Sequence, residues 1–92
     1  MVETTVTVSH PAGLHLRPAA IFVQTAARFG SEVRIQNLSR SDAPEVNGKS
    51  MFGIMQSGVS QGHVICLRVE GPDEEEALTT LRELIDSDFE QS

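Results

Sequence analysis

Strict alternation of apolar and polar side chains is the feature that most restricts the fold of this chain. In residues 2–8 and 31–37 the apolar side chains occupy alternate positions, and in residues 63–71 Ile65, Leu67 and Val69 alternate with Val64, Cys66 and Arg68. This is the period of a β-strand with one buried and one solvated face. Strands of a parallel sheet are buried on both faces and read as continuous apolar runs. The alternation therefore favours an antiparallel sheet with helices packed on one face.

Apolar residues at helical spacing predict a first helix over residues 16–29. Pro18 suits the first turn, where its missing N–H leaves no intrahelical bond unmade. Thr25 lies on the polar side of this helix, so we expect it to face solvent. The expected buried stripe consists of Ala19, Phe22, Val23, Ala26, Ala27 and Phe29.

Two further helices have start signals in the sequence. Ser50 is placed to cap a two-turn helix that Gly58 would end. Asp73 is placed to cap a last helix that extends to Phe89, and Glu76 has the spacing of a capping box. The expected buried stripe of this helix consists of Leu78, Leu81, Ile85 and Phe89.

A polar, turn-rich segment at residues 38–44 separates the second strand from a short third strand at residues 45–47. The element order is therefore β-α-β-β-α-β-α. We expect an α+β fold, an open-faced β-sandwich in which a four-stranded antiparallel sheet carries three helices on one face. Residues 1–92 are expected to form one domain, because the chain is too short for two hydrophobic cores.

Composition argues against several classes of function. The chain has one cysteine, Cys66, and its three histidines lack zinc-like spacing, so we expect no disulfide, no metal and no cofactor. No apolar run approaches the ~18 residues of a membrane span and the N-terminus lacks a signal-peptide pattern, so we expect a cytoplasmic protein. With 13 acidic and 7 basic residues, the chain is a poor nucleic-acid binder. We expect a monomer whose partners are proteins or small anions.

The stretch "GLHLRPAA" at residues 13–20 contains the candidate reactive group. A helix that begins near Leu16 places His15 beside backbone N–H groups that have no partner within the helix. This positive end, together with Arg17, disfavours the imidazolium form, so the neutral ring can act as a nucleophile. A phosphoryl group on the ring reverses the interaction, because its negative charge then faces N–H donors and a guanidinium.

The sequence offers no phosphate-binding glycine loop, no pair of general bases and no metal-binding carboxylates, so a partner must complete phosphoryl transfer. The protein would then be a reactant of other enzymes and not an enzyme itself. A solvated histidine without a function is the alternative interpretation of His15. For His10 and His63, which lack helix or basic neighbours, that alternative is preferred.

These motifs resemble the family of the histidine-containing phosphocarrier protein HPr, of the bacterial phosphoenolpyruvate-dependent sugar phosphotransferase system. The stretch "GLHLRPAA" resembles the active-site signature of that family and "NGKSMFGIM" its regulatory-serine segment. The stretch "GPDEEEAL" resembles the start of its last helix. The resemblance extends over nearly the whole chain, and the family fold has the element order given above.

The resemblance implies roles for individual residues. His15 would take a phosphoryl group on Nδ1 from enzyme I, which draws it from phosphoenolpyruvate, and would pass it to a histidine of enzyme IIA during sugar transport. Arg17 would stabilise the phosphoryl group. Ser50 would be phosphorylated by HPr kinase/phosphorylase in catabolite regulation, although a serine before a helix is also explained as its N-cap. The partner-docking surface would consist of Leu16, Ala20, Met51, Phe52 and Met55.

The chain departs from the family pattern in three places. The loop at residues 38–44 is about four residues longer than usual, which we expect to alter only an edge hairpin. Ala12 replaces a small polar residue, which removes one hydrogen bond to the phosphoryl group. Ser57 replaces a leucine and lowers burial unless its hydroxyl finds a partner.

Two other functions remain open on the sequence. The first is a regulatory HPr-like protein, which serves nitrogen control or binds a transcription regulator through phosphorylated Ser50. The second is a small interaction domain with an incidental histidine. His15 argues against a purely serine-regulated protein, because that form cannot carry a phosphoryl group on histidine. It does not exclude the nitrogen branch.

Overall fold

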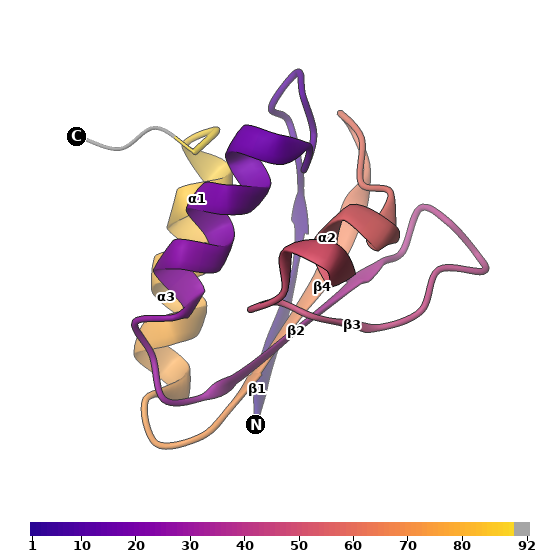
Figure 1. Cartoon of the computed structure of the whole chain (residues 1–92). Helices are drawn as coiled ribbons and strands as arrows, with labels where there is room; N and C mark the ends of the chain where they lie inside the picture. Colours follow the sequence, from indigo (N-terminus) through magenta and orange to yellow (C-terminus); the bar gives the residue numbers. More distant parts are fainter. Residues whose placement is uncertain (90–92) are drawn as a thin grey trace.

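The computed structural model describes residues 1–89, and its elements follow the predicted order (Figure 1). They are β1 (Val2–Thr7), α1 (Leu16–Ala26), β2 (Glu32–Asn37), β3 (Val46–Asn47), α2 (Met51–Ser57), β4 (Val64–Glu70) and α3 (Glu74–Asp86). None of the helices within residues 1–89 has both the length and the apolar character needed to span a lipid bilayer.

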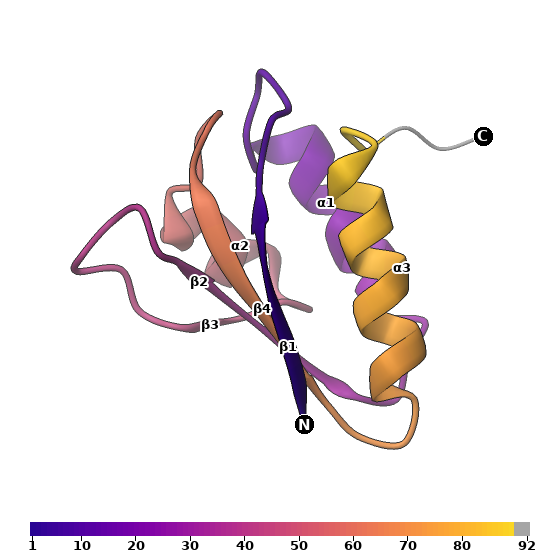
Figure 2. The same cartoon turned by 180° about the vertical axis from the view of Figure 1, so that it is seen from behind.

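The four strands form one antiparallel sheet in the order β1-β4-β2-β3. The pairing of Val6 with Ile65, and of Val33 with Val69, keeps the apolar side chains of neighbouring strands on one face. Figures 1 and 2 show the three helices on one side of this sheet, so the predicted open-faced α+β sandwich is confirmed.

The core lies between the sheet and the helices. Ile35 and Leu67 of the sheet and Phe22 of α1 are fully buried. α3 packs on β1 and β4, whereas α2 packs on β2 and β3 and also contacts α1. The start of α1 and the outer side of α2 are not covered by the sheet, and Leu16 and Phe52 are exposed there.

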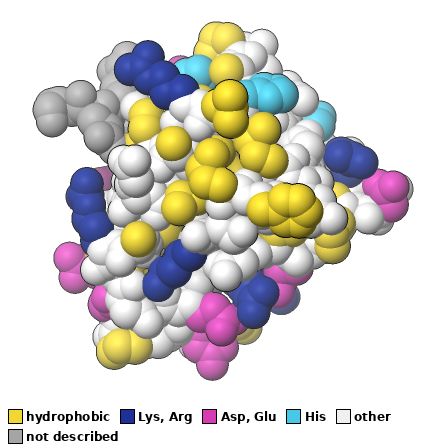
Figure 3. All heavy atoms as spheres, viewed as in Figure 1, with side chains coloured by type: hydrophobic (Ala, Val, Ile, Leu, Met, Phe, Trp, Pro, Cys, Tyr) yellow, Lys and Arg dark blue, Asp and Glu magenta, His cyan; other side chains and the backbone are white. Residues whose placement is uncertain are grey.

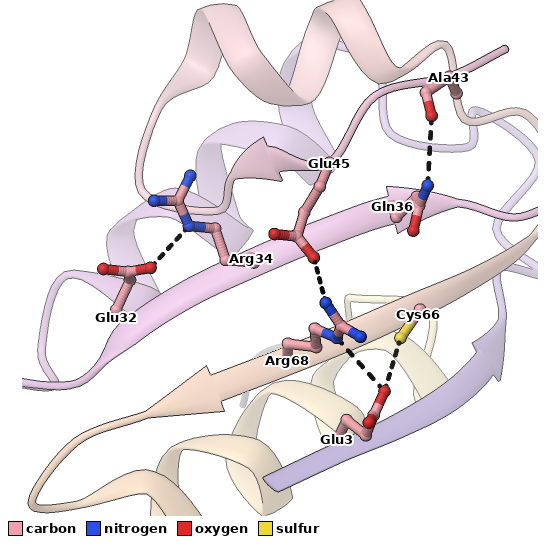
Figure 4. A network of polar contacts seen from close by, with 8 residues as sticks. All are labelled: Glu3, Glu32, Arg34, Gln36, Ala43, Glu45, Cys66 and Arg68. Carbon is pink, nitrogen blue, oxygen red and sulfur yellow. Dashed lines mark hydrogen bonds and ion pairs between the residues drawn. The ribbon is translucent and has the colours of Figure 1, made fainter. Parts of the chain in front are cut away.

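The other face of the sheet carries a network of polar side chains (Figure 4). The Arg68 guanidinium of β4 forms an ion pair with Glu3 of β1 at 3.4 Å. It forms a second ion pair at 3.0 Å with Glu45, which directly precedes β3. The Cys66 thiol donates to the Glu3 carboxylate at 3.4 Å. Burial, followed by this contact with Glu3, raises the pKa of the Cys66 thiol, so the thiol is held in its unreactive protonated form.

The expected capping role of Asp73 is wrong, because its side chain bonds to a different segment. The Asp73 carboxylate accepts hydrogen bonds from the amides of Gly30 at 2.9 Å and Ser31 at 3.0 Å, and from the Ser31 hydroxyl. The Asp73 amide donates to Ser31 Oγ at 3.2 Å, so Glu76 forms no capping box with it. The Ser31 hydroxyl and then the Gly30 amide lower the pKa of Asp73, and these bonds tie the start of α3 to the start of β2.

Three residues of the predicted helices are placed differently from the expectation, one from the polar side of α1 and two from the buried stripes. Thr25 is buried, and its hydroxyl donates to the Ile21 carbonyl at 2.8 Å within the helix. This hydrogen bond offsets the free-energy cost of burying the hydroxyl group. Ala27 follows the end of α1 and is exposed. Phe89 is buried as predicted, but it lies beyond α3 in a turn where its φ is 64°.

Candidate functional site

The loop between β1 and α1 is fixed in place by the segment that precedes β4. The Leu14 amide donates to the Val59 carbonyl at 3.1 Å. Gly13 has a φ of +57°, and a Cβ atom there would lie 2.5 Å from the Val59 oxygen, so only glycine fits. The "GLH" part of the motif is therefore a turn packed on a second loop, which sets the direction in which α1 starts.

His15 is the N-cap residue of α1, and its side chain caps nothing. Its backbone is extended, with φ −78° and ψ −164°, and its carbonyl accepts the Ala19 amide at 2.9 Å. Within residues 1–89 the ring makes no hydrogen bond, and the amides of Leu16 and Arg17 have no acceptor. Pro18 has no N–H, so the first turn offers two free donors.

His15 and Arg17 are both exposed and line the same open depression. Arg17 makes no ion pair with any residue from 1 to 89. A guanidinium and two free amides next to one imidazole form a positive environment that suits an anion on the ring. His15 and Arg17 therefore lie at the start of α1 and border the same depression, as predicted.

Ser50 is the N-cap of α2, as its spacing predicted. Its Oγ accepts the Gly53 amide at 3.2 Å, and Gly58 ends the helix in the left-handed conformation. The preceding residue, Lys49, donates to the Phe29 carbonyl at 2.7 Å, which ties the start of α2 to the end of α1. Ser50 is half-buried and lies outside the depression that contains His15.

We use the term apolar surface for the five residues Leu16, Ala20, Met51, Phe52 and Met55. Phe52 and Leu16 are 77% and 71% exposed, and Met55 is exposed to a lesser degree. Ala20 and Met51 are half-buried, and Met51 packs against the core. Figure 3 shows apolar side chains gathered over α1 and α2, with histidines at the border of the patch. Leu16 and Met55 line the depression together with His15.

Ser57 and the long loop are both accommodated by local bonds. Ser57 is fully buried, and its hydroxyl donates to the Ile54 carbonyl. The Ser57 carbonyl accepts from the buried Asn37 side chain at 3.1 Å. In the loop at residues 38–44, Ser39 accepts the Val64 amide at 2.9 Å. The loop joins β2 to the edge strand β3, and Arg40 packs against Gly58 at the end of α2.

The other two histidines are held by hydrogen bonds. His63 Nδ1 accepts the Ser60 amide at 3.1 Å and lies 3.1 Å from the Asn37 side-chain nitrogen. His10 Nδ1 accepts the Ala12 amide at 3.0 Å. Unlike His63, His10 also lines the depression, as do Asp88 and Phe89 from the far end of the chain. Sequence reasoning missed these three neighbours of His15, because no local pattern brings residues 88 and 89 to residue 10.

The part of the chain from residue 1 to residue 89 contains no group of three histidine, cysteine or acidic side chains that could bind a metal ion. The site thus consists of one free imidazole, one guanidinium, two amides and a neighbouring apolar surface. A fold of this type with an exposed imidazole in a positive environment defines a class of small α+β proteins whose histidine ring is suited to an anionic substituent.

Comparisons with known proteins identify the family. The family model for the "PTS HPr component phosphorylation site" matches residues 2–87. The phosphocarrier protein HPr of Treponema pallidum is 42% identical over 91 residues, with 99% of each chain covered. The HPr-like protein Crh of Halalkalibacterium halodurans is 43% identical and covers 96% of this chain and 100% of its own.

A solved structure agrees with these relatives. The crystal structure of HPr-C-His from Thermoanaerobacter tengcongensis has a TM-score of 0.89 and 48% identity, and it covers 100% of this chain and 99% of its own. The chain belongs to the HPr phosphocarrier family of the phosphotransferase system.

Proposed function

We propose that this protein carries a phosphoryl group on His15 from enzyme I to an enzyme IIA of a sugar permease. The observation that carries the proposal is the exposed, unbonded ring of His15 at the start of α1, next to two free amides and Arg17. Membership of the HPr family supports it. We expect the protein to act in the cytoplasm as a monomer.

In the first transfer, a ring nitrogen of neutral His15 attacks the phosphorus atom of phosphorylated enzyme I. By the family resemblance this nitrogen is Nδ1. An N–P bond forms on His15, the bond between phosphorus and enzyme I breaks, and its electron pair stays with enzyme I. The second transfer repeats this exchange, with enzyme IIA as the acceptor and His15 as the leaving group.

The shallow position of His15 suits a carrier. A site that enclosed the phosphoryl group would bind the carried form so tightly that transfer would slow, because stabilisation of the ground state gives no rate. Arg17 and the two amides offset the negative charge without enclosing it. In this proposal the protein is a reactant, and the partners supply the remaining catalytic groups.

The partners dock on the apolar surface, where Phe52 and Leu16 offer large exposed side chains. Ser50 precedes this part of α2 directly, so a phosphate there would place a dianion beside the docking area. We infer that phosphorylation by an HPr kinase deters acidic partners. Ser50→Glu should weaken enzyme I docking more at low than at high salt, because salt screens exposed charges.

Labelling with radioactive phosphoenolpyruvate and enzyme I tests the carrier function. The wild-type protein should acquire an acid-labile label that His15→Ala lacks. His63→Gln is the matched control, because it replaces a histidine outside the depression and should retain the label. An unlabelled wild-type protein beside a labelled HPr standard would refute the proposal.

The role of Arg17 is tested separately from that of His15. Arg17→Ala should slow transfer while leaving the urea midpoint of unfolding unchanged, because the side chain is exposed and has no ion pair within residues 1–89. A large loss of stability would contradict this assignment.

A regulatory role is the second candidate, because the HPr-like protein Crh of Halalkalibacterium halodurans matches nearly the whole chain. In that case the label on His15 would pass to no enzyme IIA of a sugar permease, and phosphorylated Ser50 would bind a transcription regulator. A screen of the labelled protein against the enzyme IIA proteins of the host separates the two functions.

A further inference from the structure

The C-terminal turn packs against the loop that leads to His15, and His10 forms the contact. The rings of His10 and Phe89 meet edge to face, with centroids 5.9 Å apart and planes at 78°. The Ser9 hydroxyl donates to the Asp88 carboxylate at 2.6 Å. His10 is half-buried and Phe89 almost fully buried, so the imidazole lies between the turn and the depression that contains His15.

The polar atoms of His10 organise the turn before His15. Its Nδ1 accepts the Ala12 amide at 3.0 Å, and its carbonyl accepts the Gly13 amide at 2.8 Å. The Ala12 carbonyl in turn accepts the His15 amide at 3.2 Å. Because a backbone amide can only donate, His10 Nδ1 must present its lone pair, which assigns the proton of the neutral ring to Nε2.

We propose that His10 is a positioning residue for His15: its neutral ring holds the turn at residues 10–13, and protonation of Nδ1 releases that turn. The effect of His10 on phosphoryl transfer rests on the proposed function of His15. The pH dependence of the turn at residues 10–13 does not rest on it, because it concerns only the hydrogen bond between His10 and Ala12.

Protonation breaks this bond for a geometric reason. A proton on Nδ1 would point at the Ala12 N–H, so two donors would face each other where one bond existed. Asp88 from the C-terminal turn, and His15 and Arg17 from the start of α1, line the same depression and face this region. Asp88 carries a negative charge and Arg17 a positive one, and both are present in every variant compared below.

Two substitutions at His10 distinguish the effect of its hydrogen bond with the Ala12 amide from the effect of a charge on its ring. An asparagine at this position can accept the amide two residues later in an Asx turn, and it does not titrate. His10→Asn therefore keeps the acceptor for the Ala12 amide at every pH, and His10→Ala removes it. His63→Gln is the matched control, because it removes a histidine that lies outside the depression.

The test follows the Ala12 amide in proton–nitrogen correlation spectra between about pH 5 and pH 8. The Ala12 signal should move with the same midpoint as the ring carbons of His10, in the wild type, in His63→Gln and in His15→Ala. It should stay still in His10→Asn. A signal that does not move in the wild type, or that stops moving in His15→Ala, would overturn the proposal. This measurement needs no partner protein, so its failure is distinct from a failure of the carrier function.

The consequence for transfer is measured as a ratio of rates. The rate of phosphorylation of His10→Asn by enzyme I, divided by the wild-type rate, should rise about twofold to tenfold as the pH falls through the His10 midpoint. Titration of His15 cancels in this ratio because both proteins contain that residue. His10→Ala should be slower than His10→Asn at neutral pH. A flat ratio, or equal rates of the two variants, would reject a positioning role.

Discussion

Substitutions at two residues of α2 distinguish a contribution to docking from a contribution to stability. Phe52 is 77% exposed and Ile54 is fully buried, although only one residue lies between them. Full burial of a phenylalanine side chain contributes roughly 3 kcal/mol at most. Less than a quarter of Phe52 is covered, so Phe52→Ala should lower the free energy of unfolding by less than about 0.7 kcal/mol. Ile54→Ala should lower it by about 2–5 kcal/mol, because it leaves a cavity in the core.

Urea unfolding followed by circular dichroism measures both effects. With a denaturant slope of roughly 1 kcal/mol per molar, Phe52→Ala should lower the midpoint by less than about 0.7 M and Ile54→Ala by about 2 M or more. The opposite order is expected for docking. Phe52→Ala should raise the KM for the protein as a substrate of enzyme I about fivefold to thirtyfold, the effect of losing 1–2 kcal/mol at a contact centre.

Gln56 provides the control for this prediction, because it is exposed on the same helix and lies outside the apolar surface. Gln56→Ala should change neither the urea midpoint nor the KM. If Phe52→Ala left the KM at the wild-type value, Phe52 would be an exposed side chain without a docking role. If it destabilised the protein as much as Ile54→Ala does, the argument from exposure would be wrong.

Substitutions at Ser50, Gly13 and Asp73 test the contacts that hold the site and the start of α3 in place. Ser50→Ala should lower the free energy of unfolding by about 1 kcal/mol in urea titrations, because the Gly53 amide loses its acceptor, and Ser50→Asp should restore most of it. Gly13→Ala should destabilise the protein more than Gly62→Ala: both glycines have positive φ, but only at Gly13 would a Cβ atom approach backbone, at 2.5 Å from the Val59 oxygen. Asp73 has a pKa below its usual value of 3.8 in the folded protein, so its contribution to stability is present above that value and is lost as the pH falls through the lower, folded-state pKa. Asp73→Asn should therefore lower the urea midpoint at neutral pH and flatten its decline below about pH 4, and equal slopes for both proteins would argue against the assigned bonds.

Signals that are local in the chain predicted the structure well. Ser50 and Gly58 delimit α2 because a helix cap acts within three or four residues of itself. The strands followed from their period, and the order of elements followed from the strands and helices together. His15 was placed correctly for the same reason, since a proline at the third helical position fixes where α1 begins.

Contacts between distant segments account for what the sequence did not predict. Asp73 has the residue type of an N-cap, but its carboxylate bonds to Gly30 and Ser31, more than forty positions away. The contact of His10 with Phe89 likewise joins the two ends of the chain. Neither choice of partner is visible in the neighbouring residues, because it depends on how the sheet brings the loops together.

The distribution of burial explains how a reactive site is compatible with a stable fold. His15, Leu16, Arg17 and Phe52 are exposed, so they contribute little to stability and are free to meet a partner. Their positions are determined by neighbouring groups, namely the backbone of the Gly13 turn and the Ser50 side chain that caps α2. Those supports are where stability and function are coupled. Substitutions at the exposed residues should therefore change transfer without unfolding the protein, whereas substitutions at the supports should change both together.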